Sequence, residues 1–119
     1  MLEDNEIKSL IDSIKEEDNK LTYIKNKIKR KGIEYLSLNE LNYIRKINNL
    51  PKIEISKLKD LLYNYYISYS DIQKQTGISR PMLCMILREN RNCTIKKLRL
   101  LLEVINKINK NITLKDLVG

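Results

Sequence analysis

The side chains of this sequence limit the chemistry open to it. The 119 residues contain no histidine, and the two cysteines, Cys84 and Cys93, stand nine positions apart. A structural zinc site needs four ligands, usually Cys or His, so neither zinc binding nor a disulfide framework is expected. No nucleophile–base pair or Gly-rich phosphate loop is present, and carboxylates such as Asp60 and Asp71 occupy helix-face or capping positions. We therefore expect no enzyme, no metal and no cofactor.

Lysine and arginine are the most abundant functional side chains in the sequence. Lys and Arg total 23 against 15 Asp and Glu, which gives a formal charge of +8. The first 18 residues hold seven acids and two lysines, whereas the rest of the chain holds 21 bases and eight acids. Such a field attracts polyanions, because each neutralised phosphate releases condensed counterions. The alternative is the codon bias of an AT-rich genome, which supplies Lys, Asn and Ile without any functional demand.

The composition predicts an all-α protein. Hydrophobic residues make up 42%, and the aromatic 6% is entirely Tyr, so Leu and Ile must form the core. Gly and Pro are scarce, and no window alternates with the period of a strand. The N-terminus lacks a signal-peptide pattern, and no apolar run approaches the ~18 residues of a membrane span. Free thiols suit a reducing compartment, so we expect a soluble cytoplasmic protein.

Residues 1–50 are expected to form an N-terminal helical extension. Between about Asp4 and Lys31 apolar residues recur at heptad spacing, and they form the candidate dimerisation surface: Ile7, Leu10, Ile14, Leu21, Ile24 and Ile28. Glu17 interrupts this stripe, so one alternative is a long dimer-forming helix with a single fault. The other is a turn over residues 16–20 between two shorter helices that lie on the chain's own domain.

Two further patterns follow the heptad stripe. The basic run 25–31 precedes Gly32, a candidate helix C-cap. This run is either a second basic surface beside a nucleic acid or a merely solvated face. Ser37 and Glu40 form the capping-box pattern that starts another helix, which Pro51 terminates.

Residues 51–119 are expected to form a second helical unit. Helices are predicted over about 55–66 and 94–108, with Thr94 as the N-cap of the latter. The core face of this last helix is predicted to carry Leu98, Leu101, Leu102, Ile105 and Ile108. The tail over 113–118 is expected to add a short helical turn.

The most informative stretch is residues 70–87, SDIQKQTGISRPMLCMIL. Ser70 is the expected N-cap of a first helix, with Ile72 and the aliphatic stem of Gln73 facing inward. Gly77 can take the positive φ that lets two helices meet at a steep angle.

A second helix is predicted directly after this turn. Ile78 is expected to fill the corner between the helices, and Ser79 to cap the second one. Pro81 is compatible with the first helical turn, because the N–H that it lacks has no intrahelical partner there. Apolar residues at i, i+3 and i+4 anchor the helix: Leu83, Ile86 and Leu87. The opposite face is left free for a groove.

Over residues 55–108 the chain resembles the Cro and phage-repressor (XRE-like) helix-turn-helix family. The family pattern x-x-I-x-x-x-T-G-I-S-x-x-x-L-x-x-I-L, followed by N-R-N and a long helix, matches SDIQKQTGISRPMLCMILRENRNCTIKKLRLLLEVI. The match departs at Gln73, where a small Ala is common, and at Tyr69, where a Gln often contacts phosphate. Residues 1–50 lie outside the resemblance.

The resemblance implies that the helix over 79–87 enters the major groove of DNA. The implied base contacts are Arg80, Pro81, Cys84 and Met85. The implied phosphate contacts are Tyr69, Ser70, Lys74, Ser79, Arg88, Arg91, Asn92, Lys96 and Lys97. Arg80 is the candidate for a bidentate contact to guanine, and the apolar positions suit thymine methyl groups.

Each of these assignments has a plainer alternative. Arg80 can instead hold a phosphate, and the cations after the helix can form a solvated face. The apolar positions Met82, Cys84 and Met85 can instead be covered by another helix or protein.

The resemblance leads to a dimeric, sequence-specific DNA-binding regulator as the first hypothesis. Such a protein would bind an inverted repeat and act as a repressor in a phage, plasmid or other mobile element. One alternative is a protein-interaction module, such as an antitoxin or inhibitor whose N-terminal helices grip a protein partner. Another is a plasmid replication or partition factor that binds DNA.

Overall fold

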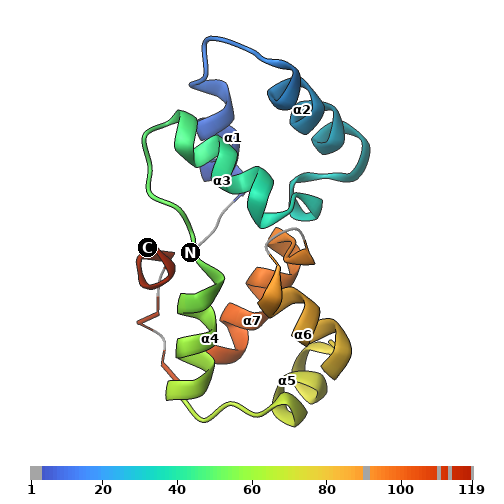
Figure 1. Ribbon diagram of the computed structural model, residues 1–119, viewed down its shortest axis with the longest axis vertical. Coiled ribbons are helices and arrows are strands. Elements are labelled where there is room, and N and C mark those ends of the chain that lie inside the picture. Colours follow the sequence, from blue (N-terminus) through green and yellow to red (C-terminus); the bar gives the residue numbers. More distant parts are fainter. Residues whose placement is uncertain (1–3, 90–91, 110, 113, 119) are drawn as a thin grey trace.

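The computed structural model shows an all-helical chain, which confirms the predicted fold class (Figure 1). The structure describes residues 4–89, 92–109, 111–112 and 114–118. The elements are α1 (Asp4–Asp12), α2 (Asn19–Lys31), η1 (Ile33–Tyr35), α3 (Leu38–Ile47), α4 (Ile55–Asn64), α5 (Tyr69–Thr76), α6 (Arg80–Arg88), α7 (Ile95–Asn106) and η3 (Leu114–Leu117). No helix within the described ranges has the length and apolarity needed to cross a membrane.

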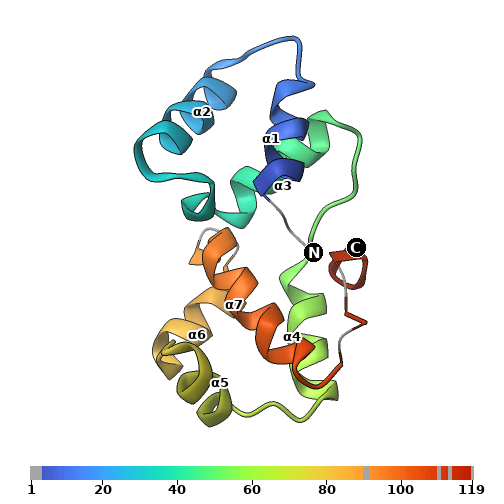
Figure 2. The same ribbon diagram turned by 180° about the vertical axis from the view of Figure 1, so that it is seen from behind.

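The helices form two lobes along the 44 Å long axis of the molecule. Helices α1–α3 form the upper lobe in Figure 1 and α4–α7 the lower one, as the opposite view in Figure 2 also shows. The lobes meet through a reciprocal pair of backbone hydrogen bonds. The Leu38 N–H donates to the Cys93 carbonyl at 2.8 Å, and the Ile95 N–H donates to the Leu36 carbonyl at 2.9 Å. These bonds fix the starts of α3 and α7 side by side.

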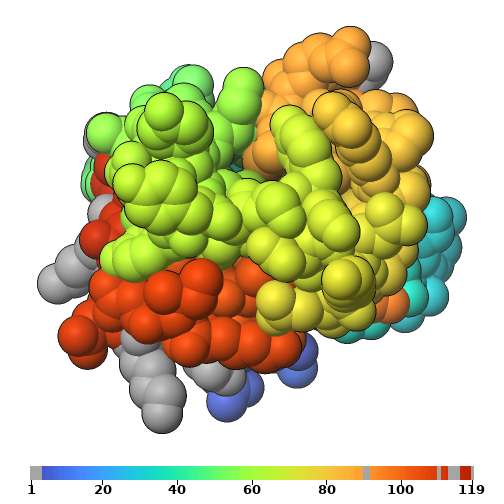
Figure 3. All heavy atoms as spheres, turned by 90° about the horizontal axis from the view of Figure 1, so that it is seen from below, coloured from blue at the N-terminus to red at the C-terminus, as the bar shows by residue number. Residues whose placement is uncertain are grey.

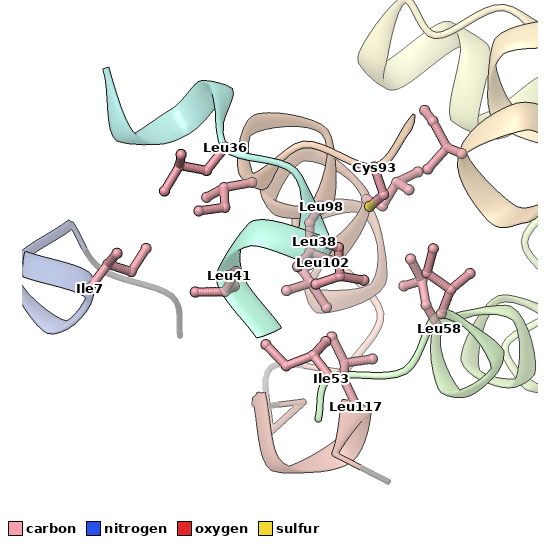
Figure 4. Packing of buried hydrophobic residues seen from close by; sticks show 14 of the residues in the cluster. Ile7, Leu36, Leu38, Leu41, Ile53, Leu58, Cys93, Leu98, Leu102 and Leu117 are labelled. Atoms are coloured by element: carbon pink, nitrogen blue, oxygen red, sulfur yellow. The ribbon is translucent and has the colours of Figure 1, made fainter. Parts of the chain in front are cut away.

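One hydrophobic core runs through both lobes. Figure 4 shows its side chains converging from α3, the α3–α4 segment, α4, α7 and the C-terminal turn; those labelled include Leu36, Leu38, Leu41, Ile53, Leu58, Leu98, Leu102 and Leu117. The predicted boundary between residues 50 and 51 falls in the extended segment between α3 and α4. Because the apolar surfaces of the two lobes cover each other, this boundary separates two groups of helices but not two cores.

The N-terminal stripe forms two short helices with a turn between them. Asp18 is the N-cap of α2, and its carboxylate accepts a hydrogen bond from the Leu21 N–H at 2.7 Å. Of the six candidate dimerisation residues, Ile7, Leu21 and Ile24 are buried in the chain's own core. The other three, Leu10, Ile14 and Ile28, pack against that core and are partly buried. The stripe is therefore not an exposed surface, and the long dimer-forming helix is replaced by the alternative of two helices packed on their own chain.

The capping residues predict where the helices begin and end more accurately than the spacing of apolar residues does. Ser37 and Glu40 form both bonds of a capping box at the start of α3, and Gly32 ends α2 with φ of 103°. Thr94 caps α7 as predicted. Helix α7 ends at Asn106, however, so Ile108 lies beyond the helix and is exposed instead of joining the core face.

A buried amide fixes the segment between α3 and α4. The Asn42 side chain donates to the Ile53 carbonyl at 3.0 Å and accepts from the Ile53 N–H at 2.9 Å. Nearby, the Arg45 guanidinium donates to the Pro51 carbonyl at 2.9 Å, and burial lowers the pKa of Arg45. Unpaired backbone groups are costly in a core, so these two side chains hold the connection in one conformation.

Candidate nucleic-acid interface

Helix α5 begins at a capping box built from Ser68 and Asp71. The Asp71 N–H donates to the Ser68 hydroxyl at 3.1 Å, and the Ser68 N–H donates to the Asp71 carboxylate at 3.2 Å. Hydrogen bonds from Ser68 stabilise the carboxylate and lower the pKa of Asp71. The predicted cap, Ser70, instead lies inside the first turn with its side chain exposed. Asp71 determines which serine is the N-cap, because in a capping box the carboxylate bonds to the backbone N–H three positions earlier, which is that of Ser68.

A tight turn over residues 77–79 joins α5 to α6. Gly77 has φ of 77° and ψ of 1°, the left-handed conformation expected at this position. The Ile78 N–H donates to the Thr76 hydroxyl at 3.1 Å, and the Ile78 side chain is buried in the corner. Ile72 is buried as predicted, whereas Gln73 is exposed, because it lies one position along the helix from the buried face.

Replacing Gly77 with alanine is expected to destabilise the chain by about 1 kcal/mol, because the turn requires a positive φ. A Cβ at this position would meet no atom within 4 Å, so backbone strain is the only cost. Thermal unfolding measures the effect, and Gly77→Asn is the matched control, since asparagine tolerates the left-handed region better than alanine. Equal melting temperatures for Gly77→Ala and the unmodified protein would contradict this account of the turn.

Helix α6 presents one face to the core and the opposite face to solvent. Ser79 caps the helix, accepting from the Met82 N–H at 3.4 Å, and Pro81 lies in the first turn. Leu83 and Ile86 are buried. The predicted base-contact residues occupy the outer side: Arg80, Pro81 and Met85 are exposed, and Cys84 is half-buried. Their role in binding stays a prediction.

Two of the predicted contacts lie against each other at the start of this helix pair. The Arg80 guanidinium lies over the ring of Tyr69, 5.0 Å from its centroid. A guanidinium stacked on a ring is held by its face and keeps its N–H groups free along its edge. Tyr69 can thus orient Arg80 while its own hydroxyl stays available for a phosphate.

Cations occur on α6 itself and on α5 and α7. Lys74, Arg88 and Lys96 are exposed, and Lys97 is half-buried with its Nζ 3.3 Å from the Met82 sulfur. Within the described residues, none of these four forms an ion pair with a carboxylate. The other predicted phosphate contacts are Ser70 and Ser79, both exposed, Asn92, which is half-buried, and Arg91, which lies outside the described residues.

Tyr35, from the upper lobe, is a neighbour of this surface that the sequence did not indicate. The Lys96 ammonium lies over the Tyr35 ring, 5.6 Å from its centroid. The two residues are brought together by the junction between the lobes. No local pattern signals such a pairing, because it depends on how η1 packs against α7.

The two thiols differ in environment, which makes Cys84 a reporter for this surface. Burial raises the pKa of the Cys93 thiol to about 12, with Lys97 acting weakly in the opposite direction. Since the thiolate is the reactive form, we expect iodoacetamide to modify Cys84 in the folded protein and to spare Cys93. Mass spectrometry of the peptides would show this, and denaturation should make both react. Equal modification of both thiols in the native state would contradict the burial of Cys93.

An apolar groove lies beside the interface. It measures about 410 Å³ and is lined by Leu62, Tyr63, Ile67, Tyr69, Ile72 and Leu87, with Lys59 and Ser68 at its rim. Figure 3 shows the surface hollowed between α4 and the segment that leads into α5. No group of three or more metal-ligating side chains occurs in the described part of the chain.

The sequence and structure were compared with known proteins. No protein-family model matches the sequence, and neither the curated proteins nor the solved structures gave a significant match.

Proposed function

We propose that the chain binds double-stranded DNA with α6 in the major groove. The observation that carries this proposal is the exposed outer face of α6, together with cations of α5, α6 and α7 that form no ion pair with a described carboxylate. Helix α5 and the turn at Gly77 place that face in a fixed orientation, as the resemblance to XRE-like helix-turn-helix proteins implies. Arg80 would contact a guanine edge, and Pro81, Cys84 and Met85 would contact bases through apolar groups. Tyr69, Lys74, Arg88, Lys96 and Lys97 would hold phosphates.

The role that fits this binding best is a transcriptional regulator, most simply a repressor that occludes its site. A dimer on an inverted repeat remains a prediction, but it cannot form through Ile7, Leu21 and Ile24 while these side chains are buried in the chain's own core. Any second copy would have to dock through another surface.

Binding through phosphates predicts a defined dependence on salt. The logarithm of the affinity for random duplex DNA should fall linearly with the logarithm of salt concentration, by ~0.9 for each phosphate neutralised. Lys97→Ala is expected to reduce this slope by about 1 and to weaken binding evenly across sequences. Lys15→Ala removes an equal charge from the exposed turn between α1 and α2 and should leave the slope unchanged. A Lys97→Ala slope equal to that of the unmodified protein would remove Lys97 from the interface.

DNA should also protect the reporter thiol. With α6 in the major groove, saturating duplex is expected to slow modification of Cys84 by iodoacetamide. Modification of Cys84 at the same rate with and without bound duplex would place the DNA elsewhere.

The apolar groove between α4 and α5 favours a second candidate, a module that binds a protein. If the chain is an antitoxin or inhibitor, its protein partner would insert apolar side chains into this groove, between Leu62 and Tyr69. A stoichiometric protein complex, without DNA affinity at ~0.15 M salt, would favour this candidate over DNA binding.

A further inference from the structure

The two lobes place their helices in a similar order around the junction. Ser37 caps α3 by accepting from the Glu40 N–H at 3.2 Å, and Thr94 caps α7 by accepting from the Lys97 N–H at 3.3 Å. These two caps are the residues that form the antiparallel bridge between the lobes. Helix α2 precedes α3 in the upper lobe, and α6 precedes α7 in the lower lobe (Figure 1). Helices α2 and α6 therefore hold corresponding places in the order of elements along the chain, each before the helix whose N-cap joins the lobes.

The outer face of α2 differs from that of α6 in being polar. Its inner face is buried through Leu21 and Ile24. The exposed residues near one side of the helix, which we call the α2 outer face, are Tyr23, Asn26, Lys29 and Arg30. Positions i, i+3 and i+7 of a helix lie on the same side, so Tyr23, Asn26 and Arg30 face one direction. Asparagine and arginine are the side chains that pair in two-point fashion with adenine and guanine.

The cations of the α2 outer face differ from the other lysines of the helix in their pairing, although Asp12 lines the same hollow as Lys29. Two other lysines of the helix are paired, Lys25 with Glu17 and Lys27 with Glu40, each at 2.8 Å. Lys29 and Arg30 form no ion pair with a described carboxylate, and the nearest acid after them in sequence is Glu34. A polyanion is the ligand whose charge complements such a face.

Helices α2 and α6 lie along the same edge of the molecule in the view of Figure 1. Figures 1 and 2 both show α2, η1 and α6 following one another along this edge. Tyr35 of η1 lies under the Lys96 ammonium, so the upper lobe contacts one of the cations of α7 there. The molecule measures 44 Å along its long axis, and its two lobes lie along that axis (Figure 1). Successive major-groove segments on one side of B-DNA are ~34 Å apart.

We propose that α2 is a second DNA-contacting helix and that one chain contacts two successive segments of the major groove. This inference rests on the proposed function, because it takes α6 as the first contact. Asn26 and Arg30 approach base edges, Lys29 contacts phosphate, and Tyr35 with Lys96 lies over the backbone between the two grooves. A single chain then supplies the two-part contact that repressors of the resembling family obtain from two subunits.

The test compares two duplexes that carry the site bound by α6, one of about 12 and one of about 24 base pairs, so that only the longer offers a second groove segment. The variant N26A/K29A/R30A removes the α2 outer face. The control N39A/K46A/K52A also removes one asparagine and two positive charges, from exposed positions around a different hollow. Circular dichroism checks that both variants are folded.

We expect the unmodified protein and the control to bind the longer duplex at least about tenfold more tightly than the shorter one. The α2 variant should lose this gain, and its salt slope on the longer duplex should be smaller by about 2. Hydroxyl-radical footprinting should show protection shortened on one side only.

Arg80→Ala, measured in parallel, separates the two levels of the proposal. If Arg80→Ala weakens binding but the α2 variant behaves as the control on both duplexes, the role of α2 is overturned and DNA binding through α6 stands. If the unmodified protein binds neither duplex at ~0.15 M salt, both proposals fail together.

Discussion

Replacing Arg80 with alanine is expected to lower affinity for the preferred DNA site by about 1–3 kcal/mol, or about 5- to 150-fold, and to relax the preference at one base pair. The reason is geometric, because a guanidinium donates two parallel hydrogen bonds to guanine and alanine donates none. Affinity for random DNA should change far less. Fluorescence anisotropy on the preferred duplex and on a scrambled duplex measures both effects.

Two controls separate base recognition from charge. Arg80→Lys keeps the positive charge but loses the planar fork, so it should recover binding to random DNA without recovering the preference. An equal loss on preferred and scrambled duplexes for Arg80→Ala would instead identify Arg80 as a phosphate contact.

The stack with Tyr69 provides an internal check on this assignment. Tyr69→Phe keeps the ring 5.0 Å from the guanidinium, whereas Tyr69→Ala removes it. If the ring orients Arg80, Tyr69→Ala should reduce the preference for the specific duplex. Tyr69→Phe removes only the hydroxyl contact to phosphate, so it should weaken binding equally on the specific and the scrambled duplex.

The second large effect is expected in stability, at the buried amide of Asn42. Asn42→Asp keeps an acceptor for the Ile53 N–H but places a carboxylate oxygen against the Ile53 carbonyl, which loses its donor. We expect a loss of about 3 kcal/mol at neutral pH and a melting temperature lower by about 10 °C. Asn39→Asp, an exposed change in the same helix, should have little effect and serves as the control.

The pH dependence of this variant has a definite sign. A protonated carboxyl can donate to the Ile53 carbonyl as the amide does, so folding should raise the pKa of the introduced acid above its ordinary value. A group whose pKa is raised by folding stabilises the protein below its unfolded-state pKa and loses that contribution as the pH rises through the folded-state pKa. The variant should therefore lie closer to the unmodified protein near pH 4 than at pH 7. A gap that does not narrow in acid would contradict this geometry.

Local patterns predicted most of the lower lobe. The turn at Gly77 and the caps at Ser79 and Thr94 depend on neighbouring residues only, so the sequence contains the information for them. Ser68 and Ser70 compete for one helix start, and Asp71, three residues after Ser68, was the signal that decides between them. The prediction that the stem of Gln73 faces inward was wrong, because Gln73 lies one position along the helix from the buried Ile72 and its side chain is exposed.

The upper lobe was harder to predict, for a physical reason. A heptad spacing of apolar residues suits a coiled coil, and it also suits two short helices packed against their own chain. Only the tertiary fold distinguishes these, because α1 packs against η1 and α3, α2 packs against η1, and Ile7 and Ile24 are buried in the chain's own core. The contacts Asn42–Ile53 and Tyr35–Lys96 likewise join residues that no local spacing relates.

Selection of bound sequences from a pool of random duplexes at ~0.15 M salt tests the central claim most directly. If α6 recognises the major groove, the pool should converge on a consensus bound at least about a thousandfold more tightly than random DNA, with a guanine position that Arg80→Ala no longer enriches. A pool that stays random through successive rounds, with no duplex retained by the folded protein, would contradict sequence-specific DNA binding by this chain.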